Sequence, residues 1–214
     1  MAMAATNWAR GLAALLAAAV LVASGTAAAD ERGEELFPLC SQCHGAAGEG
    51  NAAALAPSIA GLPAWYVETQ LQKFRSGLRG THFDDIAGMR MRPMALWLRS
   101  DEDVKAVAAH VESMPGTNPA PSLVGGNAAS GAALFVVCNA CHGVDAAGNP
   151  QLFAPPLRGA TDWYLLKQLK KFKGGVRGFN PTDQYGRIMA PMAATLADEQ
   201  AMKDVIAHIM SLSK

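Results

Sequence analysis

The chain has 214 residues, with 18 Lys and Arg against 18 Asp and Glu, so its formal net charge is zero. This balance argues against a nucleic-acid-binding protein, which needs a basic surface to contact phosphates. The apolar fraction of 50% argues against a disordered acidic chain, because it is enough to build a core.

Residues 1–29 have the three parts of a secretory signal peptide. Arg10 supplies a positive charge, residues 11–23 form an apolar run, and three alanines at 27–29 suit a signal peptidase. A retained membrane anchor is the alternative, but this run is shorter than the roughly 20 residues that span a bilayer. We predict cleavage near Ala29 and export to the periplasm.

The rest of the chain has helical patterns. A short helix is predicted over 34–40, and residues 63–76 carry apolar side chains at helical spacing before Gly77. Acidic residues open a predicted helix over 101–113. The same patterns return in the second half of the chain. They predict a helix over 132–138, a helix that carries Leu165, Leu169 and Phe172 and ends at Gly174, and a helix over 198–211. Since long alternation with period two is absent, an all-α fold is predicted.

The chain contains the same domain twice. Residues 33–116 align without a gap with residues 131–214, an offset of 98, and 33 of these 84 positions are identical. Residues 114–130 between them are rich in Pro, Gly, Ser and Asn, which is typical of a connector. We predict two small domains, at 30–117 and 118–214. Each is so small that a further group should help to form its core.

The four cysteines all lie in two C-x-x-C-H motifs. This spacing is typical of covalent c-type haem attachment. Two thiols add to the vinyl groups of one porphyrin, and the adjacent histidine reaches the iron. The motifs therefore predict two haem c groups. The residues predicted to hold them are Cys40, Cys43, His44, Cys138, Cys141 and His142.

Three other cysteine chemistries compete with haem. Two disulfides would suit an exported protein, but they leave the paired histidines unexplained. A thioredoxin-like redox motif would need a βαβ context, which the sequence lacks. A zinc site would have to join two cysteine pairs that lie 98 residues apart in separate repeats.

The second axial ligand of each iron decides the chemistry. A protein side chain there favours electron transfer, whereas an open position allows a small molecule to bind. Methionine is a soft ligand that favours Fe(II) and raises the potential. Met91 aligns with Met189 and Met94 with Met192, in segments that we predict to be non-helical. The spacing alone does not choose between the two pairs.

The remaining histidines are weaker candidates for this position. His82 aligns with Asn180, so a ligand there would break the repeat. His110 and His208 do align, but both fall late in a predicted helix. A packing or helix-end role is therefore expected for these two.

With these features the chain resembles the class I cytochromes c and, as a duplicated two-haem chain, the cytochrome c4 family. The resemblance covers nearly all of residues 31–214. It rests on both C-x-x-C-H motifs, the helices that contain Tyr66 and Tyr164, and the methionine segments before each last helix. It implies that the first methionine in each domain is the ligand, which is Met91 in the first domain and Met189 in the second.

Several other residues are expected near the haems. By resemblance, Pro57 and Pro155 lie on the histidine side, where a carbonyl can accept the ring N–H. Arg79 and Arg177 are candidates for binding a propionate. The adjoining aromatic residues are expected to close the haem pocket or bind a propionate, with core packing as the alternative for the tryptophans: Trp65, Tyr66, Trp163 and Tyr164.

These residues predict a periplasmic electron carrier and not an enzyme. By resemblance, its donor is a cytochrome bc-type complex and its acceptor a haem–copper terminal oxidase. The first alternative is the cytochrome subunit of a dehydrogenase with a flavin or quinone partner. The second is a di-haem peroxidase, which needs an open iron position. No nucleic acid and no small-molecule substrate are expected, and association with a membrane surface stays open.

The two domains differ in charge. Residues 30–118 hold 8 Lys and Arg against 12 Asp and Glu, net −4, and residues 119–214 hold 9 against 6, net +3. This asymmetry would orient encounters with charged partners, so turnover should fall with ionic strength. The alternative is that these charges only solvate helix faces. The basic residues include a predicted cluster on one helix: Lys167, Lys170, Lys171 and Lys173.

Overall fold

A computed structural model of the protein describes residues 31–212. This part of the chain is helical without strands, and two isolated bridges join Asn51 to Ala56 and Asn149 to Ala154. The predicted signal peptide lies outside the described residues. Within 31–212, none of the helices has the length and apolar character needed to cross a membrane. The all-α fold class is confirmed.

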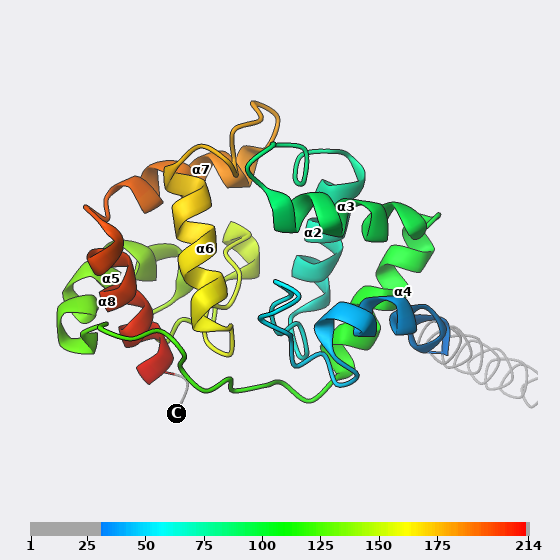
Figure 1. The fold of residues 1–214 in the computed structure, drawn as a ribbon, viewed down its shortest axis with the longest axis horizontal. Coiled ribbons are helices and arrows are strands. Elements are labelled where there is room, and N and C mark those ends of the chain that lie inside the picture. Colours follow the sequence, from blue (N-terminus) through cyan, green and yellow to red (C-terminus); the bar gives the residue numbers. More distant parts are fainter. Residues whose placement is uncertain (1–30, 213–214) are drawn as a thin grey trace, which may run out of the picture.

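The helices form two equivalent sets, one in each half of the molecule (Figure 1). In the first domain, a helix covers residues 31–44 and is followed by α2 (Ala64–Arg75), α3 (Ile86–Trp97) and α4 (Asp101–Ser113). The second domain contains α5 (Ala128–His142), the short 3-10 helix η1 (Pro150–Leu152), α6 (Asp162–Lys173), α7 (Gln184–Ala194) and α8 (Glu199–Ser211).

Local capping explains why most helix predictions are confirmed. The Ser100 side chain accepts a hydrogen bond from Asp103 N, and α4 begins at the next residue. Asp198 caps α8 in the same way. The helices that carry the cysteines are longer than predicted, at 31–44 and Ala128–His142, so each C-x-x-C-H motif lies at a helix end.

The segments around the paired methionines are helices, so the prediction of non-helical stretches is wrong. Pro93 lies inside α3 and Pro191 inside α7. A proline removes one backbone hydrogen bond from a helix interior. In α3 this loss is offset by a cap, in which Asp85 accepts a hydrogen bond from Gly88 N at 2.9 Å, and by burial of Ala95. The cap and the buried face thus outweigh the proline.

Each domain has its own core, in which the first and last helices cross closely. A Cβ atom on Gly131 of α5 would lie 1.9 Å from the carbonyl oxygen of Asp204 in α8. The equivalent Gly33 would meet Ala106 O at 2.3 Å. Only glycine permits these crossings. The first core is formed by Leu36, Phe37, Leu71, Phe74, Ala95, Leu98, Val104, Val107 and Val111. The second is formed by Phe135, Ala146, Leu165, Leu166, Leu196, Met202, Val205, Ile206, Ile209 and Met210.

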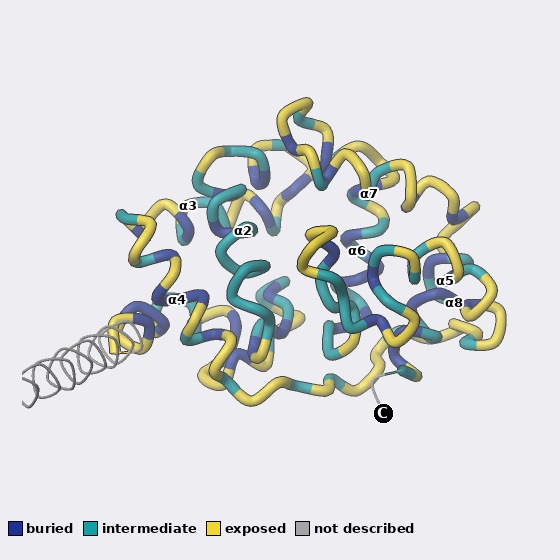
Figure 2. The backbone as a smooth tube through the Cα atoms, turned by 180° about the vertical axis from the view of Figure 1, so that it is seen from behind, coloured by how far each residue is buried: buried dark blue, intermediate teal, exposed yellow. Residues whose placement is uncertain are grey.

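The two domains lie side by side, with α2 and α6 on the sides that face each other (Figure 1). The segment between α4 and α5 runs along one edge of the molecule and is mostly exposed (Figure 2). It is fastened to the second domain by Asp162, whose carboxylate accepts hydrogen bonds from Ser122 N at 2.5 Å and Leu123 N at 2.6 Å. These hydrogen bonds hold the connector against the second domain.

Candidate haem sites

Both motif histidines are buried and oriented by a backbone carbonyl. His44 is 8% exposed and His142 5% exposed. The Nδ1 atom of His44 lies 2.8 Å from Pro57 O, and that of His142 lies 2.8 Å from Pro155 O. The structure thus places both prolines beside the histidines, as the resemblance implied.

This environment selects one form of each imidazole ring. Burial lowers the pKa of His44 and of His142 below the ordinary histidine value. A neutral ring that donates its Nδ1 proton to a carbonyl keeps a lone pair on Nε2. Nε2 is then the atom available to bind iron, as in metal-binding histidines whose other ring nitrogen donates to a backbone carbonyl.

A tight loop brings Pro57 back to His44. Gly50 N donates a hydrogen bond to His44 O at 2.7 Å, and the bridge between Asn51 and Ala56 closes the loop. Gly50 has a φ of +90°, and a Cβ atom there would lie 2.4 Å from Ser58 N. Glycine is therefore required at this position, and Gly148 repeats the feature in the second domain.

The cysteines fit thioether attachment better than the competing chemistries. All four thiols are free, so no disulfide joins them. Burial raises the pKa of Cys40 to about 11, whereas a redox-active thiol needs a lowered pKa. In the described part of the chain, no three His, Cys, Asp or Glu side chains are grouped to hold a metal ion, and the cysteine pairs lie in separate domains. Zinc is therefore not supported.

The methionines differ in their surroundings. Met91 is half-buried and packs against the core of the first domain, as does Cys40. α3 therefore brings Met91 to the same core as the first motif. Met94 and Met189 are also half-buried, but Met192 is 38% exposed.

The other histidines have packing roles. The rings of His110 and Phe37 lie 5.1 Å apart, and those of His208 and Phe135 lie 5.3 Å apart. These contacts confirm the packing role expected from the sequence. His82 stacks on Phe83 with the rings 4.7 Å apart.

Two buried guanidinium groups lie between the domains. Arg79 is 6% exposed and Arg177 is 8% exposed. Within residues 31–212 neither makes an ion pair with a carboxylate, and Arg79 Nε is buried without a hydrogen-bond partner. Burial and the charge of Arg177 both lower the pKa of Arg79. Buried cations normally pair with anions, so the propionates of two haems fit this place.

Ion pairs also cross between the domains, and the sequence did not predict them. Lys73 of α2 lies 2.6 Å from Asp183, and Lys171 of α6 contacts Asp85. These pairs are equivalent, since Lys73 aligns with Lys171 and Asp85 with Asp183 at the offset of 98. Their identity in both repeats was the signal that could have revealed them.

The four lysines predicted as one charged cluster have separate partners. Lys167 lies over the Trp163 ring, Lys170 pairs with Glu199, Lys171 contacts Asp85, and Lys173 donates to the carbonyl oxygen of Ala197. Since Lys171 is used inside the molecule, the predicted cluster is not one free basic patch.

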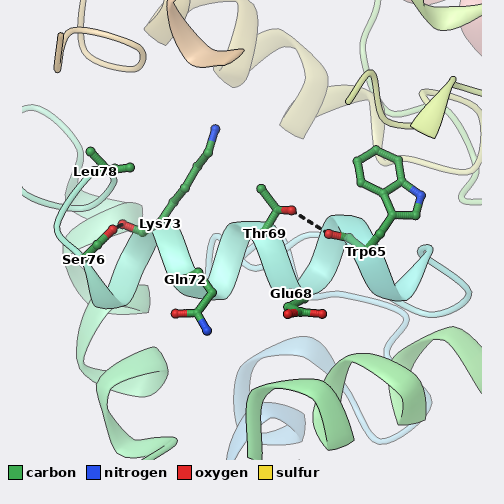
Figure 3. Close-up of a pocket in the computed structure, with 7 residues that line it drawn as sticks. All are labelled: Trp65, Glu68, Thr69, Gln72, Lys73, Ser76 and Leu78. Carbon is green, nitrogen blue, oxygen red and sulfur yellow. Dashed lines mark hydrogen bonds between the residues drawn. The ribbon is translucent and has the colours of Figure 1, made fainter. Parts of the chain in front are cut away.

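Aromatic residues complete the contact between the domains. Trp65, Thr69 and Lys73 extend from the same side of α2 and line a cavity of about 470 Å³ together with neighbouring residues (Figure 3). The Trp65 ring meets Phe153 of the second domain at 6.1 Å, and Phe153 stacks on Tyr185 at 4.2 Å. Trp65 therefore packs at the domain interface and is not part of the core of the first domain.

The cytochrome c family model matches the chain twice, over residues 31–115 and 128–213. A thiosulfate dehydrogenase electron acceptor from Stutzerimonas stutzeri is 37% identical over 180 residues, covering 79% of this chain and 78% of that protein. Both matches extend over most of the described residues.

Two solved structures share the arrangement. Reduced cytochrome c4 from Pseudomonas stutzeri has a TM-score of 0.66 and 28% identity, covering 85% of this chain and 97% of that one. Thiosulfate dehydrogenase (TsdBA) from Marichromatium purpuratum has a TM-score of 0.69 and 29% identity. That match covers 85% of this chain but 40% of the longer protein. The chain thus belongs to the cytochrome c family and is a di-haem electron carrier of the cytochrome c4 type, with two covalent haem c groups.

Proposed function

We propose that the protein is a periplasmic electron acceptor for a dehydrogenase that oxidises thiosulfate. The observation that carries this proposal is the 37% identity with a thiosulfate dehydrogenase electron acceptor over 180 residues. The likeness to TsdBA over 85% of this chain supports the same donor. Among the functions predicted from the sequence, this is the dehydrogenase alternative, now with a substrate class for the partner.

In this proposal each domain holds one haem. Each haem, when bound, supplies an iron that takes up and releases one electron. Two cysteines of each domain would hold the haem, and a proline carbonyl orients the adjacent histidine. A methionine of each domain would supply the second protein ligand of the iron, which fits an electron carrier. The assigned residues are Cys40, Cys43, His44 and Met91 in the first domain and Cys138, Cys141, His142 and Met189 in the second.

The proposal also includes export and maturation of the chain. Cleavage near Ala29 would release a two-domain protein, with domains at 30–117 and 118–214, into the periplasm. N-terminal sequencing of the protein from the periplasmic fraction tests both statements. A first residue near Asp30 is expected, whereas retention of the apolar run in the membrane fraction would contradict cleavage.

The donor is tested by mixing the oxidised protein with thiosulfate and a thiosulfate dehydrogenase. Reduction followed by absorbance should be fast only when both are present. The control omits the dehydrogenase, and a second control replaces this chain with a single-haem cytochrome c. Reduction no faster than in the control without dehydrogenase would contradict the proposed donor.

A carrier between a bc-type complex and a terminal oxidase is the second candidate. It is favoured by the likeness to cytochrome c4, which covers 97% of that chain. The same experiment with a bc-type complex and quinol in place of the dehydrogenase separates the two. Faster reduction by the bc-type complex than by the dehydrogenase would favour this second function.

Charge gives a further test of partner docking. The net charges of −4 over 30–118 and +3 over 119–214 predict that reduction by the partner slows as ionic strength rises. Reduction by a small neutral reductant is the control and should not depend on salt. If the rates of reduction by the partner and by the small reductant depended on salt in the same way, the domain charges would not orient docking.

A further inference from the structure

The two ion pairs between the domains are reciprocal and buried. Lys73 of the first domain pairs with Asp183 of the second, and Lys171 of the second pairs with Asp85 of the first. The Asp85 and Asp183 side chains are 3% and 1% exposed. Each lysine is therefore the positive partner of a carboxylate that belongs to the opposite domain and has almost no access to water.

The same carboxylates begin the helices that carry the methionines. Asp85 Oδ1 accepts a hydrogen bond from Gly88 N at 2.9 Å, in the first turn of α3. Asp183 accepts one from Gly186 N at 3.1 Å, in the first turn of α7. The contact is tight, since a Cβ atom on Gly88 would lie 2.1 Å from Asp85 Oδ2. The aspartates thus link a lysine of one domain to the methionine helix of the other.

Asp85 depends on Lys171 to remain a buried anion. Burial alone would raise the pKa of Asp85, but the hydrogen bond and charge of Lys171 hold it below its ordinary value. Without the lysine, a buried carboxylate would be left uncompensated, which is strongly unfavourable. It would then take up a proton or turn toward water, and in either case the cap of the helix would weaken.

We propose that Lys171 and Lys73 are positioning residues for the methionine ligand of the opposite domain, acting through Asp85 and Asp183. The inference rests on the proposed function, because it takes Met91 and Met189 as the axial ligands. Docking of the domains then holds α3 and α7 in place, so the methionine of each domain is positioned by a lysine from the other half of the molecule.

The test is the variant Lys171→Met in the full-length haem-loaded protein. Lys170→Met is the control, because Lys170 is 54% exposed and pairs with Glu199 on the surface. Redox titration and carbon monoxide binding to the reduced protein are measured for both. The variants Met91→Ala and Met189→Ala identify which titration step and which gas-binding haem belong to each domain.

We expect Lys171→Met to lower the potential of the first-domain haem and to let it bind carbon monoxide, although the substitution lies in the second domain. The second-domain haem and the Lys170→Met protein should match the parent. Lys171→Arg keeps the charge and should restore parent behaviour, and Lys73→Met should affect the second-domain haem instead. Where Lys171→Met fails to fold, Asp85→Asn, which keeps an oxygen for Gly88 N, should produce the first-domain effect in milder form.

Two results would overturn the inference and are distinguishable. If Met91→Ala opens the first haem to carbon monoxide but neither Lys171→Met nor Asp85→Asn changes that haem, the positioning role is wrong and the ligand assignment stands. If Met91→Ala leaves gas binding and potential unchanged, the ligand assignment of the proposed function fails, and the positioning role fails with it.

Discussion

Arg79 and Arg177 bind the same two glutamine oxygens from opposite domains. Gln70 Oε1 accepts hydrogen bonds from Arg79 at 2.8 Å and from Arg177 at 3.0 Å. Gln168 Oε1 accepts one from Arg177 at 2.7 Å and a longer one from Arg79 at 3.5 Å. Two like charges are therefore held together by neutral acceptors, an arrangement that would be stabilised by anions bound beside it.

This arrangement predicts that Arg79→Ala lowers the potential of at least one haem. A nearby buried cation favours the reduced iron, which carries one positive charge less, and its loss should shift the potential by on the order of 50 mV. Spectroscopic redox titration measures the shift. Arg158→Ala removes a half-exposed arginine that pairs with Asp145 and is the control. An unchanged titration curve for Arg79→Ala would exclude a role beside the haems.

The choice within each methionine pair is also testable. In the first domain Met91 packs against the same core as Cys40, and in the second domain Met189 is half-buried whereas Met192 is 38% exposed. We therefore expect Met91→Ala and Met189→Ala each to let one reduced haem bind carbon monoxide and to lower its potential by on the order of 0.1 V. In the Met94→Ala and Met192→Ala variants, neither reduced haem should bind carbon monoxide. Gas binding in the Met94 or Met192 variants instead would reverse the assignment.

Much of the fold, and the cysteines and histidines of the site, could be predicted from local sequence. The C-x-x-C-H motifs depend on residues that are neighbours in the chain, and the offset of 98 extends the motif and helix predictions to the second domain. The helix over 101–113 was predicted with its observed ends, because the signals of a helix start lie within a few residues.

Features that depend on tertiary contacts were missed. α3 contains Pro93, and sequence reasoning gives a proline more weight than the cap and packing that retain the helix. The sequence predicts a charged cluster that includes Lys171, whereas the partner Asp85 lies 86 residues away in the other domain. Such a pair forms only after the domains have docked, so no local pattern indicates it.

Asp162 predicts a pH-dependent attachment of the connector. Burial alone would raise its pKa, but hydrogen bonds from Leu123 N, from Ser122 and from Trp163 N hold the pKa below the ordinary value. The stabilisation is therefore complete above the unfolded pKa of about 3.9 and is lost as pH falls through the lower folded value. We expect Asp162→Ala to cost about 3 kcal/mol at pH 7.

Urea unfolding at pH 7 and below pH 4 checks this expectation. The stability gap between the parent and Asp162→Ala should narrow at the lower pH, because the parent then loses the same hydrogen bonds. Asp145→Ala, at a residue whose carboxylate is largely exposed, is the control and should change stability little at either pH. A gap that is constant with pH would show that the carboxylate charge does not hold the connector.

The close crossing of α5 and α8 predicts a severe effect of one added methyl group. Alanine normally favours a helix over glycine by about 1 kcal/mol. At Gly131, however, the new Cβ atom would lie 1.9 Å from a backbone oxygen that cannot turn away. The helices must move apart, so Gly131→Ala should destabilise the second domain by about 2 kcal/mol or more. Gly116→Ala, in the connector, is the control for an added methyl group without a clash, since no atom lies within 4 Å of its Cβ position. Thermal unfolding followed by circular dichroism should show a lower midpoint for Gly131→Ala alone, and equal midpoints would mean that the helices cross less closely.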